Sequence, residues 1–390
     1  MRRTVVIILC VAVMAALFGC GDTSQPSQEK LPTAKTVNDT YVEKAVNCWP
    51  QDLYEGKIME FQYPKQKLDG TLFEFAQEYD EASKAHVNLY RVELKDGAWK
   101  EVEIPWKKKL DKELNSKNVV IDNYCYSDKG LLYLSFNEYS MYPKTYYNNT
   151  EKYYKDYYLV DQYWFRIDEK EGLVERLNLP KLKASDYYNS NQSAESQAVN
   201  KDQLMPNIVT VLKNGNVFVG SLDSTMSGLY SSDTCKKVTG GLDISQILCC
   251  TEVVGDDDYF ILGALNKESG KVEICVYSQE GDLQYKLPTD VVYDEEKLYS
   301  GESPKMTLGV ADGEILLATE TGIYSADFGD EQLEMIVDAQ RDKTYYFSSE
   351  NTLTSDAVIL KGKDEDYYLA IKKEKDYGMD DVFLCHYTKA

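Results

Sequence analysis

A repeated pattern in the C-terminal half of the chain constrains its fold most. Residues 212–221 and 310–319 each contain an Asn-Gly or Asp-Gly turn, followed by a short apolar segment that ends in small residues. Both continue into a second matching segment, Gly-Leu-Tyr at 228–230 and Gly-Ile-Tyr at 322–324. Glycine readily adopts the positive φ that a tight hairpin turn needs, and the apolar segment suits a buried strand. The pattern therefore predicts a succession of antiparallel hairpins.

Weaker copies of the turn extend this pattern along the chain. They lie at residues 69–70, 129–130, 257–258 and 365–366, each before a strand-like segment. Strand-like segments flank every turn, which gives about four strands per unit, and repeated four-stranded units are typical of β-propeller blades. The Asp-Gly…Gly-Ile-Tyr pattern resembles the blades of two-component-regulator and quinoprotein-like propellers. The resemblance implies an all-β propeller of about six, that is six or seven, four-stranded blades.

The last repeated unit is one strand short. Strand-like segments lie at residues 356–360, 367–371 and 381–387, and the printed sequence then ends. Residues 40–49 are a candidate for the missing outer strand, and their pairing with the last unit would close the ring. The alternative is two β-sandwich domains, with a boundary in the polar residues 183–203.

Elsewhere the sequence favours strands over helices. Tyrosine is abundant, at 32 residues, which suits half-buried strand positions. Residues 107–117 are the candidate for a short helix, although the pattern there shows no clear apolar face.

The N-terminal residues predict export. Arg2 and Arg3 precede an unbroken apolar run over residues 5–18, and Gly19 and Cys20 follow directly. A positive start, an apolar core and a small residue before the cut form the layout of a bacterial secretory signal peptide. The run is shorter than the roughly 20 residues of a transmembrane helix, and no Ala-x-Ala site precedes Cys20.

The cysteine placed after the cut resembles the lipobox of bacterial lipoproteins, although Phe18 is bulkier than the residue usual there. The resemblance implies that residues 1–19 are a signal peptide that is removed, and that Cys20 carries the lipid. Residues 20–38, rich in Ser, Thr, Gln and Pro, are then a flexible tether, and residues 39–390 are the propeller. The expected location is the extracytoplasmic face of the cell membrane.

The charge of the chain excludes some partners. The formal net charge is −22, and removal of Arg2 and Arg3 would make it −24, because no acidic residue precedes Cys20. Such an acidic chain is not expected to bind nucleic-acid phosphates or anionic lipid headgroups. An acidic surface that only maintains solubility is the simpler interpretation.

Seven cysteines follow Cys20, and they do not suggest a disulfide framework. Their number is odd and their spacing wide, whereas a disulfide-stapled fold has an even, closely spaced set. Most are flanked by strand-like residues, so we expect small buried side chains. The cysteines are Cys48, Cys125, Cys235, Cys249, Cys250, Cys275 and Cys385.

No catalytic motif stands out, and no cofactor or metal is predicted. The chain has no Gly-x-Ser-x-Gly, His-Glu-x-x-His or phosphate-binding glycine loop. Its two histidines, His86 and His386, lie in strand-like segments. The acidic clusters at 256–258, 364–366 and 380–381 lack the spacing of a calcium loop, and two of them fall at predicted turns, where Asp is favoured.

A tyrosine-rich segment, residues 139–163, is the best lead to a ligand. Exposed tyrosines beside amides can stack on sugars or anchor a protein. The alternative, which the pattern favours, is that Tyr157 to Arg166 is a strand and the other tyrosines cover an edge. The candidate contact residues are Tyr142, Tyr146, Tyr147, Tyr153 and Tyr154.

These features predict a lipid-anchored, extracytoplasmic propeller that acts as a binding or interaction module. Its expected partners are the membrane, through the N-terminal lipid, and a glycan or a protein. Two alternatives stay open: an extracellular hydrolase or lyase acting on glycans, and a scaffold subunit of an envelope complex. Carboxylates converging in the central channel would favour an enzyme, and a broad apolar face would favour a fixed protein partner.

Overall fold

The computed structural model describes part of the chain between Lys35 and Ala390. The predicted signal peptide and most of the tether therefore lie outside the described residues. The described residues are 35–36, 41–47, 57–80, 82–83, 85–115, 118–141, 157–179, 182–183, 204–205, 208–212, 214–220, 228–238, 247–250, 253–254, 259–294, 304–311, 313–338, 357–362, 365–374 and 380–390.

Six sheets of three or more strands build this part of the chain. Sheet 1 contains β3 (Ile58–Phe61), β4 (Lys65–Gln66), β5 (Leu72–Asp80), β6 (Ala85–Lys95) and β7 (Ala98–Val102). Sheet 2 contains β8 (Val119–Tyr126), β9 (Leu132–Met141), β10 (Tyr157–Asp168) and β11 (Leu173–Leu177). Sheet 3 contains β14 (Ile208–Val211), β15 (Asn216–Gly220) and β16 (Gly228–Ser231).

The remaining three sheets follow in chain order. Sheet 4 contains β17 (Ile247–Cys250), β19 (Tyr259–Asn266), β20 (Lys271–Ser278) and β21 (Leu283–Val292). Sheet 5 contains β18 (Val253–Val254), β22 (Met306–Ala311), β23 (Glu314–Thr319), β24 (Gly322–Asp327) and β25 (Glu334–Asp338). Sheet 6 contains β1 (Lys35–Thr36), β2 (Tyr41–Asn47), β26 (Val358–Lys361), β27 (Tyr367–Glu374) and β28 (Asp380–Lys389). A separate pair joins β12 (Leu182–Lys183) and β13 (Leu204–Met205).

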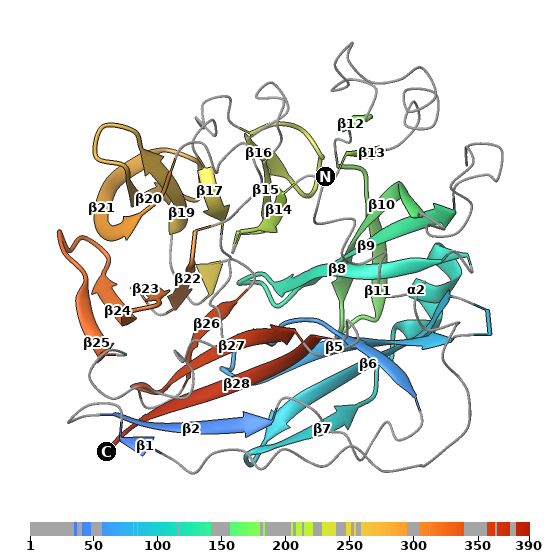
Figure 1. The fold of residues 1–390 in the computed structure, drawn as a ribbon. Coiled ribbons are helices and arrows are strands. Elements are labelled where there is room, and N and C mark those ends of the chain that lie inside the picture. The colour runs from blue at the N-terminus through green and yellow to red at the C-terminus, as the bar shows by residue number, and fades with distance from the viewer. Residues whose placement is uncertain are drawn as a thin grey trace, which may run out of the picture.

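The sheets follow one another around a ring, as the colour sequence of Figure 1 shows, so the all-β propeller is confirmed. The expected count of six or seven four-stranded blades is wrong for the described residues, because five sheets have four or five strands and form five such blades. Sheet 3 has three strands, and the described residues directly after β16 add an isolated bridge between Tyr230 and Lys237.

The predicted turns that are described lie between β4 and β5, β8 and β9, β14 and β15, β22 and β23, and β26 and β27. We count these two strands as the first and second of each blade. Five of the six are described, and each has a residue with positive φ, which glycine adopts without strain. These residues are Gly70 (φ 80°), Gly130 (71°), Gly215 (88°), Gly313 (79°) and Glu365 (61°). The turns between third and fourth strands lie at the same end of the ring, because neighbouring strands are antiparallel. We call this end the turn face; connections between second and third strands lie at the opposite face.

The predicted closure of the ring is confirmed. β2 pairs antiparallel with β28, with Tyr41 opposite Lys389 and Asn47 opposite Phe383. Sheet 6 therefore combines strands from the two ends of the described chain, and the alternative of two separate sandwiches is not what the structure shows.

Apolar contacts between successive sheets form the core. Separate buried clusters join sheets 1 and 2, 2 and 3, 5 and 6, and 6 and 1, while one larger cluster joins sheets 3, 4 and 5. A strand between two packed faces is buried on both sides, so its sequence loses the alternation of a half-exposed strand. All six residues of β23 are buried for this reason.

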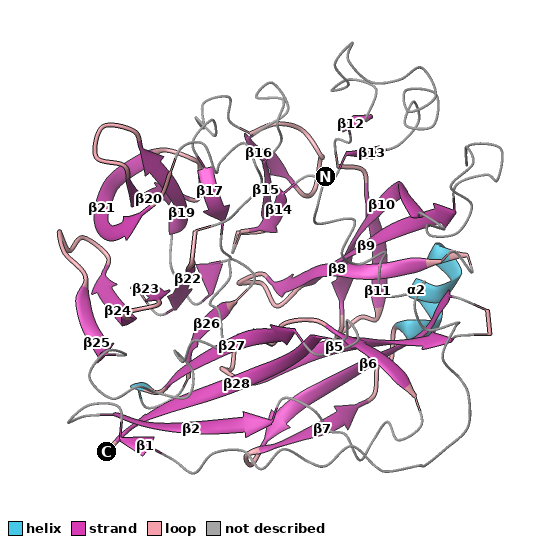
Figure 2. Ribbon diagram, in the orientation of Figure 1, coloured by secondary structure: helices cyan, strands magenta, loops and turns pink. Residues whose placement is uncertain are grey.

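The single α-helix among the described residues, α2 (Lys107–Leu114), stands beside the strands in Figure 2. It has the apolar face that the sequence pattern did not reveal, because Leu110 and Leu114 are buried, together with Trp106 just before the helix. Within the described residues, no helix has the length and apolar character needed to span a membrane.

The described cysteines agree with the sequence interpretation. Cys125, Cys275 and Cys385 are buried free thiols, and Cys235 is a half-buried one. Burial raises the pKa of the Cys385 thiol, and the nearby Glu43 raises it further, so this thiol stays protonated and packs as an apolar group.

Candidate functional site

A groove of about 1020 Å³ opens on the face opposite the turns, between sheets 4 and 5. It is bounded by the β19–β20 and β23–β24 hairpins, the end of β21 and the approach to β25. The lining residues are Asn266, Ser269, Lys271, Val272, Glu273, Pro288, Thr289, Asp290, Val291, Val292, Tyr293, Asp294, Pro304, Lys305, Leu317, Thr319, Glu320, Thr321, Tyr324, Gln332 and Leu333.

A chain of three hydroxyl groups lies in the wall that sheet 5 contributes. The hydroxyl oxygens of Thr319 and Thr321 are 2.8 Å apart, and that of Thr321 is 2.7 Å from the Tyr324 hydroxyl. The backbone N–H of Thr321 also donates to the Thr319 hydroxyl at 3.1 Å. The β23–β24 hairpin sets this geometry, because Thr319 and Gly322 are paired across its two-residue turn. We call Thr319, Thr321 and Tyr324 the hydroxyl relay.

Ion pairs neutralise most of the charge in the groove. Lys271 contacts Asp290 at 2.8 Å, and Lys305 contacts Glu320 at 2.6 Å. The Lys271 ammonium lowers the pKa of Asp290 by its hydrogen bond and its charge. Each lysine therefore already has a carboxylate partner, so the lining offers no unpaired cation to an anionic ligand.

Glu273 is a carboxylate in the lining that belongs to neither of these two ion pairs. Burial opposes ionisation of its side chain, but hydrogen bonds from Asn266 and Lys286 outweigh burial and lower its pKa. The side chain is thus held as an anion by hydrogen bonds, which does not suit a general acid, whose pKa must be raised.

On the turn face, polar contacts join every pair of neighbouring sheets. They are Arg91–Glu169 between sheets 1 and 2, Arg166–Asp233 between 2 and 3, Asn214–Gln279 between 3 and 4, Gly329–Tyr285 between 4 and 5, Tyr367–Glu314 between 5 and 6, and Gln66–Lys361 between 6 and 1. These contacts fix the relative positions of the sheets and leave the opposite face to carry the groove.

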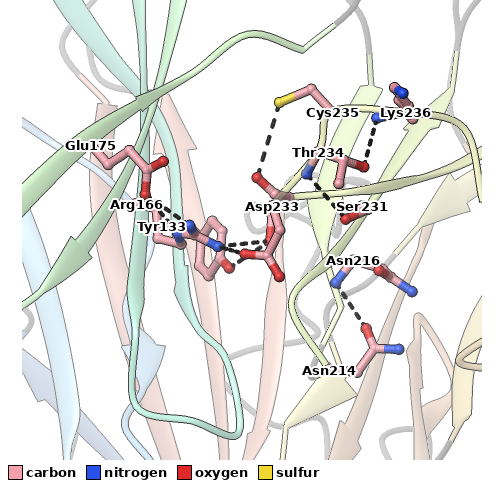
Figure 3. A network of polar contacts seen from close by, with 11 residues as sticks. Tyr133, Arg166, Glu175, Asn214, Asn216, Ser231, Asp233, Thr234, Cys235 and Lys236 are labelled. Carbon is pink, nitrogen blue, oxygen red and sulfur yellow. Dashed lines mark hydrogen bonds and ion pairs between the residues drawn. The ribbon is translucent and has the colours of Figure 1, made fainter.

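Figure 3 shows the contact between sheets 2 and 3. The Arg166 guanidinium lies between Glu175, at 2.7 Å, and Asp233. Its burial opposes its charge, but these carboxylates raise its pKa above the ordinary value. The Tyr133 hydroxyl contacts Ser232 at 3.1 Å. Because the carboxylates of Glu175 and Asp233 both pair with Arg166, we interpret this network as structural.

The Arg91 network between sheets 1 and 2 is more deeply buried. Arg91 is 4% exposed and donates to Glu169 at 2.6 Å and to the Tyr126 hydroxyl at 2.8 Å. It also lies 3.1 Å from Glu93. Burial alone would lower the pKa of Arg91, but Tyr126, Glu169 and Glu93 raise it. The guanidinium is therefore charged, and its two terminal nitrogens contact these groups, while its buried Nε makes no hydrogen bond.

Glu74 on β5 is a buried carboxyl group of a different kind. It is completely buried, and neither carboxyl oxygen has a hydrogen-bond partner. Alternation along β5 places it on the same side as Leu72 and Ala76, which pack against sheet 6. Burial raises its pKa well above the ordinary value. Burial therefore favours the neutral, protonated form of this carboxyl group.

None of the candidate site residues singled out from the sequence is among the described residues that line the groove. Cys20 and the candidate contacts Tyr142, Tyr146, Tyr147, Tyr153 and Tyr154 lie outside the described residues. Part of their segment is described: β10 begins at Tyr157, so the strand interpretation holds there, and Tyr163 is buried in the core. The described residues on either side of the remaining segment, Met141 and Tyr157, are paired.

Each of the two histidines contacts a carboxylate, and the partner of His386 belongs to one of the acidic clusters. His86 on β6 contacts Glu60 at 2.8 Å, and His386 on β28 contacts Asp366 at 2.8 Å while stacking on Tyr368. No group of three or more metal-ligating side chains occurs among the residues that the structure describes.

Of the three relay residues, the sequence pattern included Thr319 and Tyr324 but not Thr321, and it assigned neither of them a role. Thr319 and Tyr324 belong to the repeat that predicted the hairpins, in which Tyr230 is the equivalent of Tyr324. Tyr230 is buried, whereas Tyr324 is half-buried and lines the groove. Only the packing of sheet 5 against sheet 4 separates the two tyrosines, and the repeat pattern carries no signal of it.

No family model matches the chain, and no curated protein sequence matches it. Several solved structures match it over most of its length at low similarity. A protein of unknown function from Dyadobacter fermentans is 10% identical with a TM-score of 0.44, over 89% of this chain and 98% of that one. The β-propeller domain of the trilobed protease from Pyrococcus furiosus is 9% identical with a TM-score of 0.36, over 84% and 80%.

A glycan-active enzyme is among the similar structures. The GH43_1 enzyme from Xanthomonas citri, in complex with xylotriose, is 11% identical with a TM-score of 0.33, over 85% of this chain and 87% of that one. At such TM-scores the likeness says nothing about function, and the propeller fold rests on the sheets described above.

Proposed function

We propose that the protein is an exported, lipid-anchored binding protein whose propeller holds a ligand in the groove between sheets 4 and 5. The groove carries this proposal, because it combines hydroxyl, amide and apolar lining residues with ion pairs that are already formed. Polar contacts across the turn face keep the sheets in place. A binding site on so rigid a frame needs little reorganisation when it takes its ligand.

Anchoring rests on the N-terminal sequence. Arg2, Arg3, the apolar run over residues 5–18 and Cys20 support removal of the leader and acylation of Cys20. The propeller would then work outside the cytoplasm, at the membrane surface.

Metabolic labelling of the full chain in a bacterial host tests the anchor. Cells would receive an alkyne-tagged palmitate, and the protein would be followed through membrane fractionation. We expect label and membrane association for the natural sequence and for Cys10→Ala, since Cys10 lies within the discarded leader. Cys20→Ala should lose both. Label on Cys20→Ala, or release of the natural protein with its leader attached, would contradict lipid anchoring.

A variant that fills the groove tests the binding site. Ser269 is exposed at the tip of the β19–β20 hairpin and lines the groove, so Ser269→Trp should obstruct it. Ser83→Trp is the matched control, because Ser83 is exposed in the corresponding β5–β6 hairpin of sheet 1. The detergent-solubilised full chain would be screened against arrays of neutral oligosaccharides, uronic-acid oligosaccharides and peptides.

We expect binding to at least one array that Ser269→Trp abolishes and Ser83→Trp leaves intact. Binding that is insensitive to Ser269→Trp would place the ligand elsewhere and contradict the proposal. Release of new reducing ends from a bound oligosaccharide would instead identify a glycan-cleaving enzyme.

A further inference from the structure

We infer that the hydroxyl relay makes the groove selective for a neutral, polyhydroxylated ligand, that is, an uncharged glycan. The inference rests on the proposed binding function and adds the chemical class of ligand and the residues that select it. The class follows from three properties of the groove: its hydroxyl groups, its charge and its exposed apolar side chains.

The relay can present either a donor or an acceptor at the Tyr324 end. Every hydroxyl both donates and accepts, and in both contacts of the relay either oxygen can be the donor. If Thr319 donates to the carbonyl of Gly322, at 3.5 Å, the others follow and Tyr324 donates to Thr321. In the reverse orientation the Tyr324 hydroxyl hydrogen points to a ligand. Sugar hydroxyls, which also donate and accept, match such a switchable partner.

The charge distribution disfavours anionic ligands. Lys271 and Lys305 are each paired with a carboxylate, so a uronate or sulfate would have to compete with Asp290 or Glu320. It would also meet a chain of net charge −22. Like-charge repulsion of this kind selects against the wrong partner more than it strengthens the right one.

The apolar part of the lining distinguishes a glycan from a peptide strand. Val292 is 76% exposed at the end of β21, which offers a surface for the C–H face of a sugar ring. An extended peptide would need a continuous strand edge, because it binds by main-chain hydrogen bonds. β21 lacks such an edge, since Pro288 has no N–H and the pairing of β20 with β21 is irregular between Lys271 and Glu273.

Conservative variants of the relay test this inference by titration calorimetry. Tyr324→Phe keeps the ring and removes the hydroxyl, Thr321→Val keeps the volume and interrupts the relay, and Thr321→Ser keeps the hydroxyl. Tyr285→Phe is the matched control, because Tyr285 is half-buried in sheet 4 and its hydroxyl accepts from Gly329 on the turn face. Full chains in detergent would be titrated with neutral, uronic-acid and peptide ligands from the arrays, after a melting curve shows that each variant is folded.

We expect a neutral oligosaccharide to bind, with affinity lowered about 3- to 10-fold by Tyr324→Phe and by Thr321→Val, the range for one lost neutral hydrogen bond. Thr321→Ser should restore the affinity and Tyr285→Phe should leave it unchanged. The inference is wrong if neutral ligands bind the relay variants as tightly as they bind the natural protein. It is also wrong if only acidic glycans or peptides bind in a manner sensitive to Ser269→Trp. In both cases the groove-binding function stands. If Ser269→Trp alters the binding of no probe, both fail.

Discussion

The boundary between sheets 1 and 2 and the boundary between sheets 4 and 5 both have an apolar core, but they differ in their polar contacts. The first is also crossed by buried polar side chains, including Arg91 and Gln77, at several levels between the two faces of the ring. The second has an edge contact between Tyr259 and Phe328 and a hydrogen bond from Gly329 to Tyr285, and it opens into the groove.

The difference shows what each kind of contact provides. A buried ion network specifies one arrangement of two sheets, because another arrangement leaves a charge without a partner. An apolar boundary tolerates a gap at one end, where polar groups stay available for a ligand. The chain thus has a closed boundary and an open boundary within one ring.

Removal of Arg91 should have the largest effect on stability. Arg91→Met would leave Glu169 at the buried boundary without its cation, while Glu93 would keep Lys67 and Lys95, so we expect a loss of about 3–5 kcal/mol in the free energy of unfolding. Urea denaturation followed by circular dichroism measures it. Lys100→Ala, which breaks the exposed pair with Asp96, should leave the unfolding curve unchanged. Equal effects of the two variants would show that the closed boundary does not depend on its buried ions.

Replacement of Glu74 should stabilise the protein at neutral pH, in contrast to replacement of Arg91, because the Glu74 carboxyl group is buried without a hydrogen-bond partner. Its folded-state pKa is raised, so its contribution is fully present below the unfolded pKa near 4.5 and is lost as the pH rises towards the folded pKa. The slope is about 1.4 kcal/mol per pH unit for one proton. Glu74→Gln should remove this slope and be more stable than the natural protein at neutral pH, as unfolding curves at several pH values would show.

Glu93→Gln provides the contrast for that measurement. Burial opposes ionisation of Glu93, but Lys67 and Lys95 lower its pKa overall, so its contribution is present at neutral pH and lost as the pH falls. We therefore expect Glu93→Gln to destabilise the protein at neutral pH. A stabilising Glu93→Gln or a destabilising Glu74→Gln would reverse the distinction between paired and unpaired buried carboxyl groups.

Substitution of Gln77 tests the boundary between sheets 1 and 2 without changing a charge. Its amide donates to the carbonyl of Val119 at 3.0 Å and accepts from the N–H of Ile121. Gln77→Leu leaves both backbone groups buried without that partner, at a cost of about 1–3 kcal/mol. Hydrogen exchange of the Ile121 amide should accelerate more than that of amides in sheet 5. Unchanged protection of Ile121 would show that the amide does not hold the two sheets together.

Tyr285→Phe should have the smallest effect on stability. It breaks the bond from Gly329 at the open boundary and keeps the ring, so the expected loss is about 0.5–1 kcal/mol, measured by thermal unfolding. A loss as large as that of Arg91→Met would mean that the open boundary also relies on its polar contact.

The local pattern was sufficient to predict the elements that depend on nearby residues. Asn214-Gly215 and Asp312-Gly313 predicted hairpins because a tight turn needs positive φ. The incomplete last unit likewise predicted that residues 40–49 would pair with the C-terminal strands. The number of blades and the apolar face of α2 were missed, since both depend on partners distant in the sequence: Leu110 and Leu114 become an apolar face only against sheets 1 and 2.

By itself, the sequence determined that this chain forms repeated hairpins and closes them with a strand from near its other end, because turn geometry and strand patterning are local properties. Which polar side chains close a boundary and which line a groove was decided only by the tertiary structure. Tyr230 and Tyr324 occupy equivalent places in the repeat, yet one is buried and the other lines the groove. The physical reason is that the burial of a side chain is set by the neighbouring sheet, which its own repeat does not encode.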